Sequence, residues 1–381
     1  MADLSALWAV EMLIAAFAGG AFGAALGALP AFIFTGFMVI AGESANIIGK
    51  AVAGASQSGP VAELAAVGIT GSIAFGAPFS PAISFAGGAA AAAYAAKRGY
   101  MESGFDYHNA KDIAFAQGTK PDVLAVGGLF GIIGYWLVEL SAAFAMPYDP
   151  IAMGVVLSAI IHRLVFGYDI IGDTGKGILN MKPFEDGNRR IIGEAATEGE
   201  ETTPDEPVAD GGATVEGRFV VEPWLPHQYK WANVATIGLV VGILAAYIAY
   251  MTGSPFLAFG ISAASLVFLN CGVEKIPVTH HMSLPASTAA LALAPASASV
   301  TQMAPSEVAS VVPFLPALVV GGVFGVVCAL AGEVIQRVFY AHADTHLDPP
   351  AAAIVVGTLL VAILAILGVF PQAVWVPTFG L

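Results

Sequence analysis

Long apolar segments without charged residues recur along the whole chain and limit what it can fold into. Two examples are the runs Ala89–Ala96 and Ile354–Leu367, which are rich in alanine or leucine. About 20 such residues in a helix cross the roughly 30 Å hydrocarbon core of a bilayer, where a helix satisfies its own backbone hydrogen bonds. The chain is 57% hydrophobic and 11% charged, whereas soluble domains carry about 25% charged residues. The predicted fold class is therefore all-α, a polytopic membrane helix bundle.

Breaks in the apolar pattern predict the positions of the helices. In the first half they fall at residues 5–27, 30–42, 60–76, 78–97, 121–146 and 150–168. In the second half they fall at residues 231–252, 255–271, 277–297, 313–339 and 350–370. We expect about 9–11 transmembrane or re-entrant helices, because the shorter segments could enter and leave the bilayer on one side.

An internal repeat is the most informative feature of the sequence. The block Val123–Gly134 resembles Ala317–Cys328, and at the same offset Glu139 matches Glu333. Two further matches in the same order are Pro78–Phe85 with Pro277–Leu284 and Asp149-Pro150 with Asp348-Pro349. Several matched blocks in one order predict two pseudo-symmetric repeats. The predicted divisions are a first transmembrane repeat (1–168), an acidic soluble linker (169–229) and a second transmembrane repeat (230–381). The sequence leaves open whether the two repeats are parallel or inverted.

The charge is concentrated in the linker, where eleven acids stand against three bases between Glu185 and Glu222. This composition predicts a solvated or disordered loop, and acidic loops of this kind also suit a high-salt cytoplasm, as in a halophile. Nucleic acid is not an expected partner, because phosphate binding needs clustered lysine and arginine. The two cysteines, Cys271 and Cys328, lie in apolar surroundings and are predicted to be buried free thiols.

The basic residues predict the orientation in the membrane. Lys97, Arg98, Lys111 and Lys120 flank or lie in the loop 98–120, and a second group of basic residues follows the next pair of helices, in the linker. Loops rich in lysine and arginine stay on the cytoplasmic side. We therefore expect an integral protein of the cell membrane with the loops 98–120 and 169–229 in the cytoplasm.

The matched acids Glu139 and Glu333 are the first candidate functional residues. A carboxyl group within a membrane helix costs a few kcal/mol to insert and normally faces a cavity or a partner. These acids could bind a cation or carry a proton along a transport route. The alternative is a structural role near the helix ends, at the interface or paired with Arg163 or Arg337.

A proline-broken segment, Pro277–Ser283, is the second candidate. It contains Thr279, His280, His281 and Ser283, and it follows Asn270 and Glu274. Irregular backbone at membrane depth is tolerated where it lines a cavity, so this segment is predicted to line a pore or binding site. The matching first-repeat segment offers Ser80 and Ser84 without an ionisable group, and the alternative for the second-repeat segment is an interfacial loop with solvated histidines.

A third cluster alternates ligand-type side chains between two predicted helices. Its members are His342, Asp344, His346 and Asp348. In an extended segment these side chains would share one face, as a divalent-metal site requires. A solvated polar turn is the alternative, and the sequence identifies no other cofactor.

The two-halved plan with proline-broken segments resembles the general design of repeat-built permeases and channels. The leading hypothesis is therefore an integral membrane transporter or channel for a small polar solute or ion, with its path between the repeats. A metal-dependent membrane-embedded enzyme and a structural subunit of a membrane complex are the alternatives. The expected partners are the lipid bilayer and the solute, and association of several copies of the chain stays open.

Overall fold

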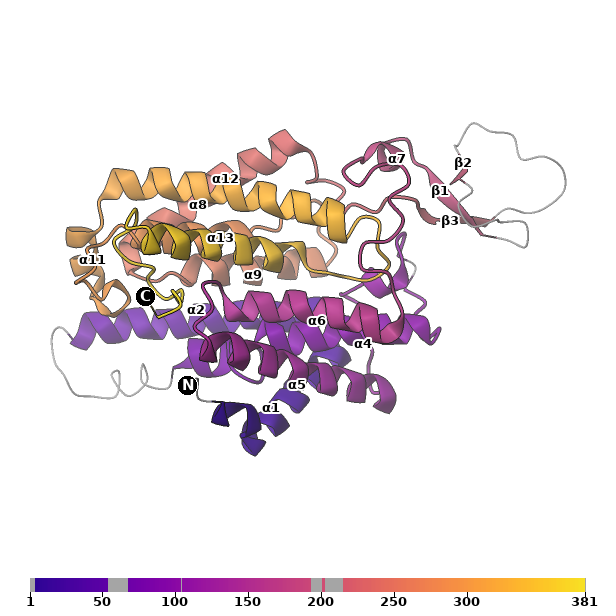
Figure 1. Ribbon diagram of the computed structural model, residues 1–381, viewed down its shortest axis with the longest axis horizontal. Helices are drawn as coiled ribbons and strands as arrows, with labels where there is room; N and C mark the ends of the chain where they lie inside the picture. The colour runs from indigo at the N-terminus through magenta and orange to yellow at the C-terminus, as the bar shows by residue number, and fades with distance from the viewer. Residues whose placement is uncertain (1–3, 54–67, 104, 193–200, 203–214, 381) are drawn as a thin grey trace.

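The computed structural model describes residues 4–53, 68–103, 105–192, 201–202 and 215–380. This part of the chain is mostly helical, and its three strands are short (Figure 1). The first half contains η1 (Ser5–Trp8), α1 (Val10–Leu26), α2 (Ala28–Ala53), η2 (Thr70–Ala74), η3 (Pro81–Phe85), α4 (Ala86–Lys97), η4 (Asn109–Lys111), α5 (Pro121–Ala143) and α6 (Pro150–Phe166). The second half contains α8 (Trp231–Thr252), α9 (Leu257–Asn270), α10 (His280–Leu291), η5 (Val300–Gln302), α11 (Pro305–Val311), α12 (Phe314–Phe339) and α13 (Pro349–Ile366).

Five of the described helices are long and apolar enough to cross a membrane. They are α2, α5, α8, α12 and α13, and the shorter apolar helices are α1, α6 and α9. Apolar side chains such as Leu239 and Ile243 on α8, and Val319 and Val323 on α12, point outward and are at least 40% exposed. Each pair is spaced four residues apart, so it forms one outward face of its helix. Length, composition and these exposed faces support a membrane protein with a helical fold.

The predicted helices agree with the structure apart from small shifts at their ends and three larger differences. The predicted helix 277–297 is shorter in the structure, where α10 covers only His280–Leu291. Helix α2 continues beyond residue 42 because the carboxylate of Glu43 is buried and accepts hydrogen bonds from Thr70, at 2.8 Å, and from Ser254. The predicted helix 60–76 falls largely outside the described residues, and its end forms the π-helical turn η2. Asp149 and Asp348 each cap the helix that follows, as the matched Asp-Pro pairs indicate.

The connections between helices lie at two ends of the molecule. The loops 98–120 and 169–229 share one end, called here the linker end, because Lys111 Nζ lies 2.5 Å from Glu222 Oε2. The opposite end, called the far end, holds α11 and the C-terminal tail 367–380, whose Phe379 N–H donates to the Ala145 carbonyl (Figure 1). Helix α5 therefore runs from the linker end to the far end, and α12 runs in the opposite direction.

Glycines allow the closest helix contacts in both halves. A Cβ atom at Gly20 on α1 would lie 2.2 Å from the carbonyl oxygen of Gly127 on α5. In the second half, a Cβ atom at Gly242 on α8 would lie 2.2 Å from the carbonyl oxygen of Gly321 on α12. Both distances are far below van der Waals contact, so only glycine permits these crossings.

The two broken helices start inside the bundle. The continuous segment η3–α4 begins after Ser80, and α10 begins after Thr279. Every residue of α10 is buried, and so is every residue of η3. Both segments contain proline: Pro81 stands in the first turn of η3, where its missing N–H is not needed, and Pro285 lies inside α10, where it removes one backbone hydrogen-bond donor.

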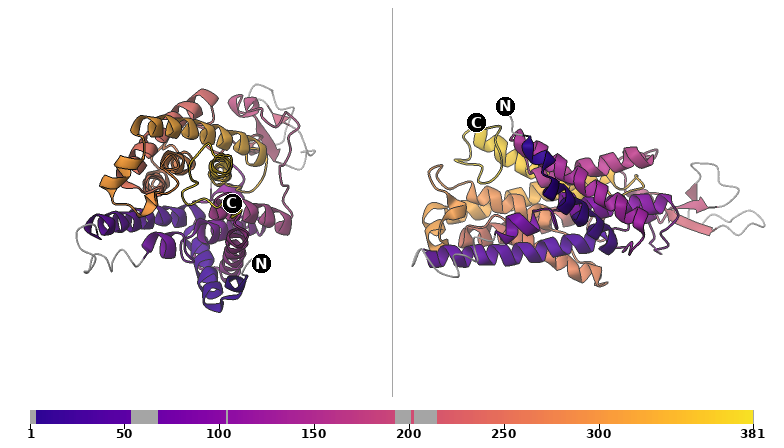
Figure 2. Two further views of the ribbon diagram at one scale, coloured as in Figure 1. Left: turned by 60° about the vertical axis from the view of Figure 1, so that its left-hand side comes forward. Right: turned by 90° about the horizontal axis from the view of Figure 1, so that it is seen from below.

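The halves meet through two pairs of helices. Where α2 crosses α9, a Cβ atom at Gly36 would lie 2.4 Å from Ala264 N, and one at Gly260 would lie 2.7 Å from Val39 Cγ1. Helix α6 packs against α13, where the backbone N–H of Asp149 donates to Thr358 Oγ1 over 2.9 Å. Between these two contacts the halves leave space for a cavity, and Figure 2 shows the bundle from two further sides.

The linker forms regular secondary structure in its described part, whereas the acidic segments 193–200 and 203–214, for which a solvated or disordered loop is predicted, lie outside the described residues. It forms α7 (Lys182–Glu185) and an antiparallel sheet of β1 (Arg189–Ile192), β2 (Glu201–Thr202) and β3 (Val215–Phe219) in the order β2-β1-β3. The all-α prediction therefore holds for the bundle but not for the linker. The linker also docks on the second half, because Arg337 Nη2 donates to the Tyr229 carbonyl over 3.0 Å.

The prediction of two buried cysteines is correct for Cys328 only. Cys271 is exposed, because it follows the end of α9.

Candidate functional site

A cavity of about 1280 Å³ lies between the two halves. Its wall includes residues of α2, η3 and α6 from the first half and residues of α9, α10 and α13 from the second half. Ligand pockets usually measure about 300–1,000 Å³. The cavity is therefore large enough for a small organic molecule.

The cavity is bordered by exposed residues at the linker end. Asp106 in the loop 98–120 lines it, with a side chain that is 70% exposed. Glu274 and Lys275, which connect α9 to α10, line it as well and are also exposed. Through these residues the cavity reaches solvent at the linker end.

Aromatic rings follow one another along the cavity wall. From the linker end to the far end, this aromatic row consists of Tyr340, His346, Phe85, Phe32, His280, Phe259, Phe75, Phe256 and Trp375. Consecutive ring centroids lie between 4.7 and 6.1 Å apart, within the range of favourable ring contacts. Both halves contribute rings, so the row runs across their interface.

A carboxylate paired with one histidine lies on the part of this wall near the linker end, and a second histidine lines the same cavity. Asp348 caps α13: its Oδ2 accepts from Ala351 N over 2.8 Å, and its Oδ1 lies 3.3 Å from His346 Nε2. His280, the first residue of α10, also lines the cavity and is 5% exposed. Its ring makes no hydrogen bond to another residue of the described part. The group offers one negative charge and a polar ring without a partner.

The first half places a simpler group on the cavity wall. Asp149 caps α6 through hydrogen bonds from Ile151 N at 2.8 Å and Ala152 N at 3.3 Å, and it is 7% exposed. At the start of the broken helix of this half, Pro81 also lines the cavity. This group has a carboxylate but no histidine.

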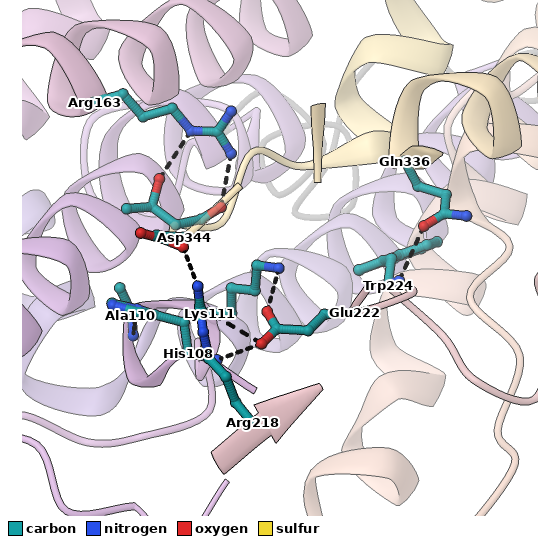
Figure 3. A network of polar contacts seen from close by, with 10 residues as sticks. His108, Ala110, Lys111, Arg163, Arg218, Glu222, Trp224, Gln336 and Asp344 are labelled. Carbon is teal, nitrogen blue, oxygen red and sulfur yellow. Dashed lines mark hydrogen bonds and ion pairs between the residues drawn. The ribbon is translucent and has the colours of Figure 1, made fainter. Parts of the chain in front are cut away.

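A polar network holds the loop 98–120, the linker and the end of α12 together at the linker end (Figure 3). The buried Lys111 pairs with Glu222, which also accepts from the backbone N–H of His108 over 3.1 Å. Arg218 lies 3.5 Å from Glu222 and pairs with Asp344. Since Lys111 lines the cavity, this network forms part of its border.

Burial changes the ionisation of two groups in this network. Desolvation lowers the pKa of Lys111 to about 8, although the adjacent Glu222 opposes the shift. Desolvation, with the charge of Arg218, lowers the pKa of His108 to about 4. His108 is therefore neutral at pH 7, consistent with its Nδ1 accepting from Ala110 N over 3.1 Å.

The residues predicted in the broken helices divide into two groups. Asn270, Glu274 and His280 line the cavity. The hydroxyl residues Thr279, Ser283, Ser80 and Ser84 are buried at the helix starts instead. Thr279 Oγ1 lies 2.5 Å from Ser262 Oγ, and Ser283 Oγ donates to the His280 carbonyl. These hydroxyl groups lie at the helix starts. The alternative of an interfacial loop with solvated histidines is wrong, because His280 and His281 are both buried.

The two matched glutamates lie away from the cavity and from each other. Glu333 Oε1 lies 2.6 Å from Arg337 Nε and accepts from Gln336 over 3.0 Å. Pairing with Arg337 was one of the two alternatives for this residue. His281 lies beside Glu333 in a second, very small pocket of about 10 Å³. Glu139 is half-buried on α5 and belongs to neither pocket.

The segment from His342 to Asp348 is neither an extended metal site nor a solvated turn. Its backbone bends, and His342 and His346 are only 2% and 1% exposed. The side chains have separate partners: His342 bonds to the Ile178 carbonyl, Asp344 to Arg218, and His346 to Asp348. Among the described residues no three His, Cys, Asp or Glu side chains come together to hold a metal ion.

Sequence reasoning missed most of the cavity wall. The aromatic residues gave no distinct signal, because phenylalanine is equally common in helices that face lipid or a packed core. Asp149 was noted only as part of a matched Asp-Pro pair. Lys111 was counted for orientation alone, since its buried contact with Glu222 joins residues 111 positions apart.

A protein-family model matches residues 1–379, and its description is "Family of unknown function (DUF7973)". The chain belongs to this family. No curated protein and no solved structure matches the chain. The match covers both halves and the linker, so the cavity lies wholly within the family's own region.

Proposed function

We propose that the chain is an integral membrane transporter or channel for a small solute or ion, with its path through the cavity between the halves. The cavity itself is the observation that carries this proposal. Residues from both halves line it, and its wall continues from exposed residues at the linker end to Trp375 near the far end. A bundle that served only for packing would have no need of such a space.

We further infer that the two halves are inverted repeats. One support is that Gly20 meets Gly127 and Gly242 meets Gly321 at the same close distance. A second support is that α5 and α12, which carry the matched sequence blocks, run in opposite directions. Transporters built from inverted repeats bind their substrate between the repeats, next to broken helices. Here η3 and α10 are the broken helices, and both border the cavity.

The proposal includes a location and an orientation. Loops rich in lysine and arginine stay in the cytoplasm, so the linker end with the loops 98–120 and 169–229 is proposed to be cytoplasmic, in the cell membrane. The cavity would then be accessible from the cytoplasm in the conformation described. The alternative of a metal-dependent enzyme has less support, because the described residues bring no set of metal ligands together.

A cysteine placed in the cavity tests the proposal. Ala351 lines the cavity and is 5% exposed, whereas Ala245 is 1% exposed in the core of the second half. Ala351→Cys and Ala245→Cys would each be made with Cys271→Ser, which removes the exposed native thiol. In proteoliposomes, we expect a membrane-impermeant methanethiosulfonate reagent to modify only Ala351→Cys.

The same proteoliposomes would be used to measure solute flux by stopped-flow light scattering with a panel of small solutes. We expect modification of Ala351→Cys to reduce the flux of any solute that the protein transports, and modification of the Ala245→Cys sample to leave it unchanged. Equal reactivity of the two cysteines, or no protein-dependent flux for any solute, would contradict the proposed function. Glu333→Gln should leave the flux unchanged, because Glu333 lies outside the cavity.

A further inference from the structure

The cavity wall combines aromatic faces with an excess of acidic groups. The acids that line it are Asp106, Asp112, Asp149, Glu274 and Asp348, and the bases are Lys111 and Lys275. Lys111 is already neutralised by Glu222 at 2.5 Å, and Lys275 is exposed at the linker end. The inner part of the cavity therefore carries the charges of Asp149 and Asp348 without a lysine or arginine beside them.

Aromatic rings attract cations through the negative potential of their faces. Around Asp348 the nearest part of the aromatic row consists of His346, which contacts Asp348, and Phe85, whose ring centroid lies 5.7 Å from that of His346. Phe32 continues the row, 6.1 Å from Phe85 and 4.7 Å from the His280 ring. A ligand at this place would meet a carboxylate on one side and aromatic side chains on the others.

Other ligand classes fit this wall less well. A small inorganic cation would need several oxygen ligands, and the Asp348 oxygens already accept hydrogen bonds from Ala351 and His346. An anion could use the N-terminus of α10 and the His280 ring, but it would lie close to the Asp348 charge. A strongly hydrated neutral solute would gain little from the rings.

We propose that the cavity binds a small organic cation with an apolar body, held between Asp348 and the rings of Phe32 and Phe85. The inference rests on the proposed transport function and names its substrate class. The quaternary or protonated amine would lie beside Asp348, and the apolar body would extend along the aromatic row. The unpartnered ring of His280 would supply one hydrogen bond to a polar group on the ligand.

Equilibrium binding to the full chain in lipid nanodiscs tests this assignment separately from transport. The probes are choline, its neutral carbon isostere 3,3-dimethyl-1-butanol, and the anion 3,3-dimethylbutanoate, which are close in size and shape. Isothermal titration calorimetry gives the affinities, and quenching of Trp224 and Trp375, which both line the cavity, reports occupancy. We expect choline to bind at least about tenfold more tightly than either of the other probes.

Matched variants assign the binding to the wall residues. Asp348→Asn removes the charge but keeps a good helix cap, and it should weaken choline binding about tenfold while leaving the isostere unchanged. Phe32→Leu should weaken choline binding about fivefold, and Phe32→Tyr, which keeps the ring, should restore it. The controls are Glu333→Gln and Phe130→Leu, since Glu333 and Phe130 are buried and lie outside the cavity.

The outcomes separate this inference from the proposed function. Equal binding of the three probes, or tightest binding of the anion, would overturn the cation assignment, whatever the flux measurements show. An unchanged affinity in Asp348→Asn would overturn it as well. A third outcome is that choline binds with the expected variant pattern but the protein mediates no flux of any solute. This result would support the cation site and contradict transport.

Discussion

The two halves share their closest backbone contacts but differ in the side chains that they present. Where the broken helix begins, the first half has Ser80 and Pro81, and the second half has Thr279 and His280. The loops between matched helices differ even more. The loop 98–120 carries the buried Lys111 in a charged network, whereas the segment between α10 and α12 packs apolar side chains such as Val308.

Helix packing and the side chains of the cavity wall are therefore under separate constraints. The glycine crossings leave no space for a side chain, so both halves keep glycine there. The cavity wall leaves space for variation, and the second half alone places histidines beside its capping aspartate. Four predictions test how far the two halves are equivalent.

The largest effect is expected at the charged loop, which has no counterpart in the second half. Lys111→Met should lower the free energy of unfolding by about 3–5 kcal/mol, because it leaves the Glu222 carboxylate buried without its partner. Denaturant titration in mixed micelles measures the change. Lys182→Met is the control, since the ion pair of Lys182 and Asp186 is exposed to solvent and should contribute little to stability. Similar losses in both variants would show that Lys111 is not buried as described.

The glycine crossings should respond equally in the two halves. Gly20→Ala and Gly242→Ala should each lower the free energy of unfolding by about 1–3 kcal/mol, because each new methyl group meets a carbonyl oxygen at 2.2 Å. Thermal unfolding of the purified protein gives the comparison. Gly71→Ala, where a Cβ atom would meet nothing within 4 Å, should be neutral. A large loss in one half only would show that the two crossings are not equivalent.

Acidification should weaken the charged loop and leave the matched apolar segment unaffected. The pKa of His108 is lowered to about 4 in the folded protein, compared with about 6.5 when unfolded. Between these values the unfolded state binds more protons, so stability falls as the pH falls from about 6.5 to 4, by at most about 1.4 kcal/mol per pH unit. His108→Asn should flatten this part of the stability curve measured against pH. An identical curve for the variant would argue against a neutral, buried His108.

The smallest effect is expected at the two helix caps. Asp149→Ala and Asp348→Ala should each lower the free energy of unfolding by about 1 kcal/mol, because each removes a side chain that accepts backbone N–H groups at the start of a helix. The corresponding Asn variants should retain most of the stability. If Asp348→Ala proves much more harmful than Asp149→Ala, its contact with His346 adds to stability and the two caps differ in role.

The helical fold with membrane-spanning candidates and most helix positions could be predicted from the residues alone. Apolar runs, proline, glycine and capping aspartates act within one helix or between neighbours in the chain, so their pattern is visible in the residues. For this reason α8 lies at the predicted residues and α6 begins where Asp149-Pro150 indicated. His280 was also found in this way, because a histidine beside a proline break is unusual in a membrane helix.

Which side chains face the cavity became clear from the three-dimensional structure. Phe32, Phe85 and Asp348 come together from segments that lie far apart in the chain, and no local pattern distinguishes a ring that lines a cavity from one that faces lipid. For Glu333 the sequence left a functional role and a pair with Arg337 open, and the structure shows the pair, outside the cavity. The reason is physical: the energy of a buried charge or ring depends on its neighbours in space, which the fold alone brings together.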